Sequence, residues 1–543
     1  MPELLHPGVY VQEVSSGLQP IQGVSTSTAA FIGITDKGPI PGTKTPTGVA
    51  AQPGFVTSMS DYLRRYGGFR TDSFLTYAVQ SFYQNGGKRL YIVRVANGAT
   101  AAGLGSLLSP VSPPADAFPI SAASEGVWGN QIWIQYSASS DGVAGNFRLT
   151  VMYGATDAEA KQNVVESYDN VTNADPNPNV ALPSNYVGTA VNSRSEYIAF
   201  TSRVTTLPGP LPSPRFQLGG GSDGNALGEL DFIGVSAADS SVTGTGLYAL
   251  DKITDVSLIA IPGRGDVTTV NAGIDYCKNQ RPLNDCFFIG DVGIITDVKV
   301  ARTPNAATDV ITVSNARDFA VIGGIDKAAG DYGAIYWPWV FATDPIGTGS
   351  NPKILLPPSG FLAGIYARTD NSRGVFKAPA GTEAGVAGAL GPFVQVSDTE
   401  QDILNPVSLN VIRTVPTSGL VVWGARTIGS DAEWRYVPVR RMAIFLRTSI
   451  YYGIQWAVFE PNAEPLWASL RLNIRAFMFT QFRAGAFKGT KPDDAFFVLC
   501  DSSTTTQTDI DNGVVNILVG FAPLKPAEFV VLKLSQIVNQ PAS

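Results

Sequence analysis

A single histidine, His6, limits the acid–base and metal chemistry that this chain of 543 residues can perform. A zinc protease of the two-histidine type needs a second imidazole, and a Ser-His-Asp triad would depend on a residue close to the start of the chain. We expect a local turn role for His6 beside Pro7. The three cysteines, Cys277, Cys286 and Cys500, form no CxxC pair, so the usual zinc and thioredoxin-type patterns are missing.

Glycine-rich stretches can cradle phosphates and acidic pairs can bind cations, but the spacing here fits neither role. The stretch "GGGSDG" (219–224) lacks the Lys-Ser/Thr ending of a phosphate loop, and "NGGKRLY" (85–91) leads into a strand where such a loop would open a helix. The acidic pair Asp493-Asp494 lies in a polar turn without EF-hand spacing. The sequence therefore predicts no catalytic residue, no metal site and no cofactor, and the chain is not expected to be an enzyme.

Composition points to a large protein whose surface carries few charges. Hydrophobic residues make up 44% of the chain and charged residues 15%. The 38 Lys+Arg and 45 Asp+Glu residues give a net charge of −7, which argues against nucleic acid as a partner. No Lys or Arg precedes Lys37, no long apolar stretch is present, and the cysteine number is odd. We expect no secretory signal, no membrane insertion, buried or free thiols, and a cytoplasmic site of synthesis.

Hydrophobic periodicity predicts a mixed α/β fold for the first hundred residues. With 56 glycines and 37 prolines, the chain favours short strands and turns. The pattern predicts a buried strand over 27–35 and a short capped helix over 60–69 that ends at Gly67. It then predicts an amphipathic helix over 73–87, with Phe74, Tyr77, Ala78 and Phe82 near one face, followed by the strand "RLYIVRV".

Composition shifts divide the remainder of the chain. From about residue 99, Ala, Ser, Gly and Pro dominate, and the stretch 120–218 alternates like a β-rich insertion with strands such as "QIWIQY" and "FRLTVMY". Short apolar strands separated by helical or loop segments follow to about residue 390, as in an α/β domain. A further domain is predicted to begin near Gln401.

Two helices are well specified near the C-terminus. Over 436–462, Pro438 suits a first helical turn and apolar residues recur at helical spacing. Over 466–487, an apolar side is formed by Trp467, Leu470, Ile474, Phe477 and Met478, while Arg471 and Arg475 stand four apart on another side. These arginines belong either to an ordinary solvated face or to a dock for an acidic protein surface.

Many segments, taken together and in order, resemble contractile tail sheath proteins of phages and related contractile injection systems. The N-terminal signature is "HPGVYVQEV", "GVSTSTAAFIG" and "NGGKRLYIVRV". Further along lie "YGAIYWPWV", "PPSGFLAGIYARTD", "YVPVRRMAIFLRTSI", "WAVFEPN" and "LWASLRLNIRAFM". The resemblance covers most of the chain and is weakest over 100–215 and 225–320. Its specificity lies in the number and order of the segments, since none is a catalytic signature.

The resemblance implies a multidomain, mixed α+β fold with a discontinuous inner α/β domain built from both chain ends, inserted outer domains and extended terminal β-arms. The implied divisions are an N-terminal arm strand (1–22), an inner domain (23–98 and 400–522), a β-rich outer insertion (99–220), a middle α/β domain (221–399) and a C-terminal arm strand (523–543).

The resemblance also implies a mechanical role. Subunits of such proteins stack as rings into a helical sleeve around an inner tube, and the sleeve contracts to drive the tube through a target envelope. Expected partners are further copies of the chain, the inner tube protein, and baseplate and terminator or cap proteins, within a phage tail or phage-tail-like particle assembled in the bacterial cytoplasm. The alternative is a non-contractile surface binding or decoration protein of a phage-like particle.

Exposed terminal strands are an aggregation hazard unless they have a designated partner, so the arms are expected to add strands to a neighbouring subunit. The arm-strand candidates are Val9, Tyr10, Val11, Val14, Phe529, Val530, Val531, Leu532 and Leu534. The hinge or tether candidates are Ser15, Ser16, Gly17, Gly23, Pro523 and Pro526. Arg471 and Arg475 are the candidate contacts to the tube.

Overall fold

The computed structural model describes residues 20–529 except 46, 105–119, 176, 206–211, 240, 294–300, 303–311 and 322. The chain forms two compact units, each of which gathers segments distant in sequence. The terminal unit comprises the described residues of 1–24, 374–377 and 438–543, and the sheet unit comprises those of 25–373 and 378–437. Both chain ends therefore contribute to one unit.

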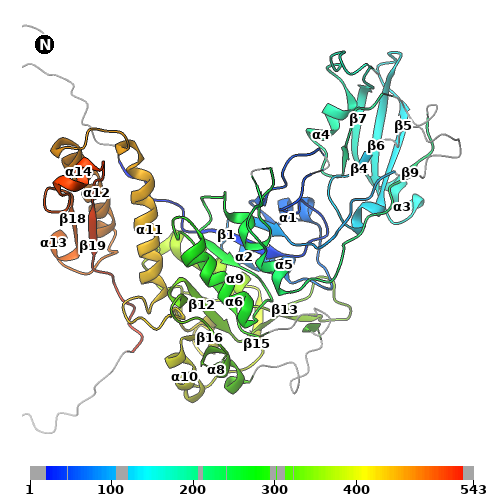
Figure 1. The fold of residues 1–543 in the computed structure, drawn as a ribbon. Coiled ribbons are helices and arrows are strands. Elements are labelled where there is room, and N and C mark those ends of the chain that lie inside the picture. Colours follow the sequence, from blue (N-terminus) through cyan, green and yellow to red (C-terminus); the bar gives the residue numbers. More distant parts are fainter. Residues whose placement is uncertain are drawn as a thin grey trace, which may run out of the picture. The chain divides into compact units, whose positions relative to one another are not determined.

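An eight-stranded sheet, ordered β17-β16-β12-β11-β10-β1-β3-β2, forms the framework of the sheet unit (Figure 1). The six inner strands are parallel, and the short edge strands β2 and β17 are antiparallel to their neighbours. Every residue of β1, β11 and β12 is buried, as expected for parallel strands covered on both faces. The strands are β1 (Thr28–Gly33), β2 (Gly54–Val56), β3 (Arg89–Arg94), β10 (Leu258–Ala260), β11 (Phe287–Asp291), β12 (Gly333–Trp337), β16 (Leu409–Val415) and β17 (Gly419–Val422).

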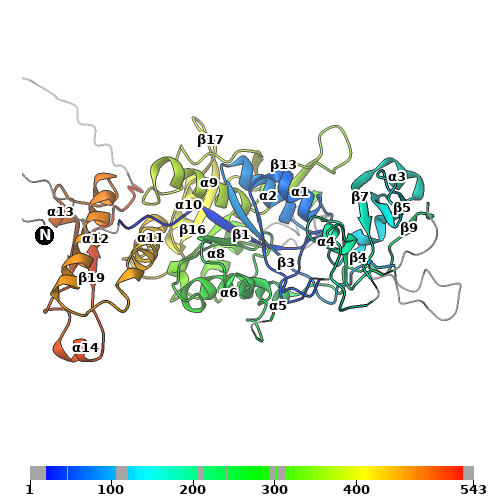
Figure 2. The same cartoon turned by 90° about the horizontal axis from the view of Figure 1, so that it is seen from above.

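Helices cover both faces of this sheet. Figure 2 shows α2 and α9 on one side of it and α5 and α6 on the other. The helices of the sheet unit outside the insertion are α1 (Met59–Tyr66), α2 (Leu75–Gln84), α5 (Glu229–Ile233), α6 (Val267–Asp275), α8 (Val313–Val321), α9 (Ser359–Arg373) and α10 (Asp398–Leu404). A small antiparallel sheet, ordered β14-β13-β15, is formed by Lys353–Leu356, Val340–Thr343 and Ala389–Pro392. Short helical turns add Gly246–Leu250, Tyr276–Gln280, Gly330–Tyr332 and Asn405–Val407.

The helix predicted over 73–87 is confirmed as α2, but it is buried more completely than an amphipathic helix would be. The reason is that α9 packs directly against it. A Cβ atom added at Gly360 would lie 2.6 Å from the Cα of Ala78, and one at Gly364 would lie 2.6 Å from the carbonyl oxygen of Phe82. Glycines in α9 thus let the two helix backbones approach closely, which the sequence of α2 alone does not reveal.

A buried carboxylate joins β11 to the start of α9. Asp291 is 1% exposed, and it accepts hydrogen bonds from the backbone N–H of Gly263 (3.0 Å) and from both the N–H and the hydroxyl of Ser359 (2.8 Å each). Burial raises the pKa of Asp291 to about 6, although these three donors oppose the shift. The hydrogen bonds therefore offset only part of the cost of burying the charge.

The insertion, residues 99–222 of the sheet unit, has its own sheets and its own hydrophobic core. Its four-stranded antiparallel sheet is ordered β7-β6-β5-β9, and β4 pairs with β8. Tyr136, Phe147 and Leu149 are among its fully buried core residues. Its elements are β4 (Ile120–Ala122), a short helical turn (Val127–Gln131), β5 (Ile132–Ala138), β6 (Asn146–Tyr153), α3 (Asp157–Gln162), β7 (Val164–Thr172), α4 (Val187–Asn192), β8 (Ile198–Phe200) and β9 (Phe216–Gln217).

The terminal unit packs helices against a two-stranded sheet. Five residues predicted to form the apolar side of the helix over 466–487 are buried in α12, which confirms that prediction: Trp467, Leu470, Ile474, Phe477 and Met478. The elements are α11 (Val437–Gly453), which begins at the end of the sheet unit, a helical turn (Gln455–Ala457), α12 (Glu464–Arg483), α13 (Pro492–Ala495), β18 (Phe496–Leu499), α14 (Gln507–Asp511) and β19 (Leu518–Phe521).

The strands that pair in the eight-stranded sheet come from segments of different predicted domains. Strands from 28–94 pair with strands from 258–422, so the predicted separation of an inner domain (23–98 and 400–522) from a middle domain (221–399) is not how the sheet is built. The change between units falls at 437/438 and not near Gln401, because β16 pairs in parallel with β12. Parallel pairing joins strands that are distant in sequence, and local composition carries no signal of it.

Replacing Asp291 by Asn should change how stability depends on pH. The pKa of Asp291 is raised in the fold, so its contribution to the free energy of unfolding is greatest below about pH 4 and is lost as pH rises through about 6. Relative to the parent, Asp291→Asn should therefore gain stability between pH 4.5 and 7.5, as measured by urea unfolding at both values. A stability difference that is the same at both pH values would contradict this assignment.

Candidate assembly surfaces

No cluster of metal-ligating side chains is found in the part of the chain that the structure describes. Among those residues no group of three or more His, Cys, Asp or Glu side chains could hold a metal ion. Cys277, Cys286 and Cys500 are buried free thiols, as predicted. Burial raises the pKa of Cys500 to about 11, which keeps this thiol protonated and unreactive near neutral pH. Within the described residues, every helix is too short or too polar to cross a lipid bilayer.

The place where a doubly wound sheet usually binds a ligand is filled by side chains. Numbered along the chain, the parallel strands run in the order 2-1-3-4-5-6, which reverses between β1 and β10. Ligands of such sheets bind outside the carboxyl ends of the strands at that reversal. Here the buried ring of Phe74 packs against Gly263, which follows β10. A Cβ atom added at Gly263 would lie 2.5 Å from this ring. Phe74 also packs edge-on against Trp339, with ring centroids 5.3 Å apart.

An open hollow of about 600 Å³ lies on the insertion, lined by residues that include Tyr186, Thr189, Phe200 and Arg203. Its one guanidinium is already occupied, because Arg203 donates to the backbone carbonyl oxygens of Asp175, Pro178 and Val180. The hollow is otherwise lined by hydroxyl, amide and apolar groups, and it presents no cation ready to bind an anion.

The β18–β19 sheet of the terminal unit has apolar side chains on both of its faces. Phe496 and Val498 face a buried cluster that includes Ile474 and Met478. On the other face Phe497, Leu499 and Leu518 are 47%, 39% and 53% exposed, and Leu499 lies opposite Leu518 in the antiparallel register. No third strand pairs with this sheet in the part of the chain described. Sequence reasoning missed this surface, although the all-apolar run "FFVL" is a signal of a strand covered on both faces.

Residues 21–24 are docked along α11. The backbone N–H of Val24 donates to the hydroxyl of Ser449 (3.1 Å), and Ile21 packs beside Gly453 and the cluster under the β18–β19 sheet. Gly23 lies against the ring of Phe445, where a Cβ would be 2.9 Å from the ring. This position is therefore closely packed, and the glycine permits the contact.

The remaining predicted arm and tether residues are only partly within the described structure. Val9, Tyr10, Val11, Val14, Ser15, Ser16 and Gly17 lie outside it, as do Val530, Val531, Leu532 and Leu534. Phe529, the last described residue, is 76% exposed. Pro523 forms an isolated antiparallel bridge with Phe487, so the chain continues from β19 along the body of the unit, and Pro526 is half-buried.

The basic stripe predicted on α12 is balanced by carboxylates. Arg475, 55% exposed at its side chain, pairs with Asp493 (2.7 Å). Arg471 pairs with Glu464 (2.7 Å) and donates to the carbonyl oxygen of Cys500. The bond with Glu464 raises the pKa of Arg471. Arg475 is thus the more accessible of the two guanidinium groups, and Arg471 is partly committed to holding the end of β18.

The insertion leaves and rejoins the sheet through two segments that pair with each other. Thr100 and Ser222 exchange two backbone hydrogen bonds, of 2.9 and 3.0 Å. Gly103 and Gly219 also exchange two backbone hydrogen bonds, again of 2.9 and 3.0 Å. This short two-stranded stem fixes the ends of the insertion side by side beyond β3.

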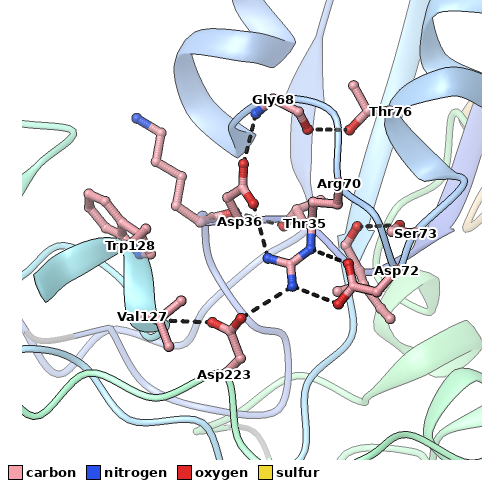
Figure 3. A network of polar contacts seen from close by, with 12 residues as sticks. Thr35, Asp36, Gly68, Arg70, Asp72, Ser73, Thr76, Val127, Trp128 and Asp223 are labelled. Carbon is pink, nitrogen blue, oxygen red and sulfur yellow. Dashed lines mark hydrogen bonds and ion pairs between the residues drawn. The ribbon is translucent and has the colours of Figure 1, made fainter. Parts of the chain in front are cut away.

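Arg70 ties the base of the insertion to the loops at the sheet (Figure 3). Its guanidinium contacts Asp72 through two bonds (2.7 and 2.8 Å), Asp36 at 2.9 Å and Asp223 at 3.2 Å. Asp223 in turn accepts the backbone N–H of Val127 within the insertion (2.9 Å). The bond with Arg70 lowers the pKa of Asp72, so the ion pair between these two residues persists to lower pH than an ordinary carboxylate would allow. Sequence reasoning missed the network, because its members are far apart along the chain.

A buried lysine adds a second anchor at the same junction. The Nζ of Lys37 lies 4.3 Å from the ring centroid of Tyr197 and 5.4 Å from that of Trp128, both in the insertion. Lys37 is 8% exposed, and burial lowers its pKa. Such a partly desolvated cation–π contact contributes about 1 kcal/mol or more. The insertion is thus held by charge and aromatic contacts as well as by its stem.

Comparison with known proteins identifies two sheath domains in the chain. Residues 247–428 match the model of the phage tail sheath protein central domain, and residues 429–537 match that of the phage tail sheath C-terminal domain. Together these ranges span more than half of the 543 residues. They also bear out the resemblance seen in the sequence motifs.

Individual relatives are distant. A prophage major tail sheath protein of Pseudomonas aeruginosa (strain UCBPP-PA14) is 27% identical over 185 residues, which cover 33% of this chain and 46% of the relative. The match therefore spans less than half the length of that curated relative. Among solved structures, the helical sheath of the anti-feeding prophage in its contracted state superposes with a TM-score of 0.54 at 21% identity, over 98% of this chain and 100% of that one. The sheath tail protein of Listeria innocua gives a TM-score of 0.56 at 13% identity, over 93% and 96%.

Replacing Arg70 by Met should loosen the insertion at its base. The change leaves three carboxylates without their shared cation, and we expect it to cost about 2 kcal/mol of stability in urea unfolding. Amide hydrogen exchange of Val127 should become faster, because Asp223 is no longer held in place. The matched control is Arg64→Met, which breaks exposed pairs with Asp61 and Glu196 and should cost less than about 1 kcal/mol. Equal effects of the two variants would contradict the role given to Arg70.

Proposed function

Because this chain belongs to the phage tail sheath proteins, we propose that it is a structural subunit of a contractile sheath. In this proposal its copies stack as rings into a helical sleeve around an inner tube, above a baseplate and below a terminator or cap. The sleeve shortens on triggering and drives the tube through a target envelope. The fold shared with the contracted sheath of the anti-feeding prophage supports this proposal. The filled ligand crevice of the sheet supports a structural and non-enzymatic role.

The observation that carries the proposal is the incomplete sheet of the terminal unit. A two-stranded sheet is marginal on its own, and its outer edges offer backbone N–H and C=O groups to further strands. Phe497, Leu499 and Leu518 add an apolar face that one unit leaves uncovered. The same unit contains both ends of the described chain, so the predicted arm segments begin where such a sheet is already present.

Strands added by neighbouring copies would pair with the outer edges of this sheet and would cover its apolar face. Each added backbone hydrogen bond contributes about 1 kcal/mol net, and each added strand also covers apolar side chains. An arm of five or six residues therefore links two subunits with a defined register while leaving their folded cores free to move. We propose that residues 9–14 and 529–534 supply these strands, with Ser15, Ser16, Gly17, Pro523 and Pro526 as tethers.

Contraction requires that the extended sleeve be less stable than the contracted one and that a barrier separate them. In our proposal, new packing between folded cores drives the change, and the arms keep the subunits connected throughout. No phosphate loop is present in the sequence, so we expect firing to proceed without nucleotide. The tube is proposed to contact the helix that carries Arg471 and Arg475, through an acidic surface of its own.

Removing residues 1–19, or residues 530–543, should give folded protein that no longer forms sleeves. Both deletions spare every described residue, including Ile21 and its packing, so circular dichroism and thermal unfolding should match the full chain. Assembly would be measured by sedimentation and negative-stain microscopy. Sleeves formed normally by either truncated chain would contradict the arm proposal.

The acceptor sheet can be tested separately with Leu499→Glu combined with Leu518→Lys. These two residues lie opposite each other, so the introduced charges can pair across the strands while the apolar face becomes polar. Assembly should fail in this variant. The matched control changes two exposed apolar residues of the sheet unit, Leu230 (77% exposed) and Val235 (68%), to Lys, and it should assemble like the parent.

Reversing the charge of Arg475 should weaken attachment to the tube. Arg475→Glu places a carboxylate beside Asp493 and removes the accessible guanidinium, and we expect at least a tenfold loss of tube bound in co-sedimentation. Asp493→Ala is the control, because it frees Arg475 from its intramolecular partner and should bind the tube at least as well as the parent. If Arg475→Glu binds normally, the arginine belongs to an ordinary solvated face.

A further inference from the structure

The loop between α11 and α12 presents an aromatic side chain entirely to solvent. Phe459 is 102% exposed, the highest value among the described large apolar residues, and its neighbour Val458 is 58% exposed. Phe459 also has a positive φ of 70°, a backbone conformation that is unusual for a bulky residue and costs about 1 kcal/mol or more. Glycine or asparagine would hold this turn more easily, so folding of the monomer gives no reason for phenylalanine here.

The base of this loop is firmly held, so the tip is presented in a fixed position. Trp456 packs against the cluster of Leu466, Trp467 and Leu470 at the start of α12. The Nδ2 of Asn462 donates to the carbonyl oxygen of Val514 (3.0 Å), and its Oδ1 accepts from the indole N–H of Trp467 (2.9 Å). A rigid exposed aromatic loses little conformational freedom on binding, which is the property of an interface anchor.

Charge differs between the two ends of α12, whose 20 residues span about 30 Å. Figure 2 shows α14 and α13 at opposite ends of this helix. At the first end lies the Phe459 tip with Glu460, which has no ion-pair partner in the described part of the chain. Glu464, Asp501, Asp509 and Asp511 add negative charge there, and Arg471 is the cation that the described contacts place beside them.

The second end is basic and also apolar. Arg483, Lys488 and Lys491 are exposed and form no ion pair within the described ranges, and Phe479, one turn before Arg483, is 42% exposed. Arg483 can stabilise the helix dipole, but Lys488 and Lys491 lie beyond the last turn, where that effect fades. Two carboxylates accompany these cations: Asp493 is paired with Arg475, and Asp494 is exposed, so cations still outnumber carboxylates at this end. One unit thus carries an acidic, aromatic tip and a basic, aromatic surface at opposite ends.

We infer that the Phe459 tip binds the basic end of α12 in a second copy of this chain. Phe459 packs beside Phe479 of the neighbour, and Glu460 pairs with Lys488 or Lys491. The two surfaces differ, so the contact is head-to-tail and repeats from copy to copy into a ring or an open helical row. The inference rests on the proposed self-assembly, and it names a core contact separate from the terminal arms.

Charge reversal at the two ends tests this contact in the full chain. Glu460→Lys should raise the concentration needed for half-maximal assembly at least tenfold, since it brings like charges together. Adding Lys488→Glu and Lys491→Glu to the same chain should bring that concentration back to within about threefold of the parent, because each reversed tip then meets a reversed surface. Failure of this rescue would overturn the inference.

A second measurement uses Phe459→Ser, which should fold normally because the ring is fully exposed to solvent, and should also weaken assembly at least tenfold. If this variant assembles like the parent, whether or not it loses binding to the tube, the second copy is not the partner of the tip and the inference is wrong. If the parent chain itself forms no assembly, the proposed function fails together with the inference. Normal assembly of the parent with unaffected variants overturns the inference alone.

Discussion

The parallel pairing of β1 with β3 on one side and β10 on the other is the constraint on which the sheet unit depends. Ala29 is in register with Leu90 and with Leu258 at once, so a strand near the start of the chain joins two segments separated by more than 160 residues. The insertion lies in the connection between β3 and β10. Its ends must therefore return to nearly the same place, and the paired stem at Thr100 and Ser222, together with Arg70 and Lys37, brings this about. A folded module inserted at such a point adds little closure entropy, because its own core fixes the distance between its ends.

The same sheet has a strand order that is common among enzymes. Its strand order creates the reversal at which related sheets bind nucleotides or flavins, but Phe74 fills the space beside Gly263. The buried Asp291 follows the same logic, since its three donors are spent in joining β11 to α9. The Asp291 carboxylate at the carboxyl end of β11 thus holds the start of α9 in place.

The sequence predicted individual elements well and their grouping poorly. Local periodicity identified β1, α1, α2, α11 and α12, because each has a cap, a glycine stop or an apolar face that is readable within 20 residues. It could not show that β16 pairs with β12. It also could not show that α9 packs closely against α2 at its glycines, or that Arg70 contacts carboxylates from three separate loops. These features depend on contacts between residues far apart in the chain. The motifs that resemble tail sheath proteins identified the family, which periodicity could not do, but the domain divisions that they implied differ from the grouping of strands in the sheet.

The terminal unit leaves apolar surface in water at several places, among them the outer face of β18–β19 and the Phe459 tip. Burying each large side chain is worth about 2 kcal/mol, so the free subunit gives up stability that an assembly can recover. Exposed strands of this kind invite disordered aggregation, and two features of the chain oppose it. The strands are only four residues long, which limits how many registers a wrong partner can find. The net charge of −7 makes copies repel each other until complementary surfaces meet. In the sleeve that we propose, ordered polymerisation requires several weak and specific contacts to form together. A large assembly held in this way can later exchange one packing of its cores for another.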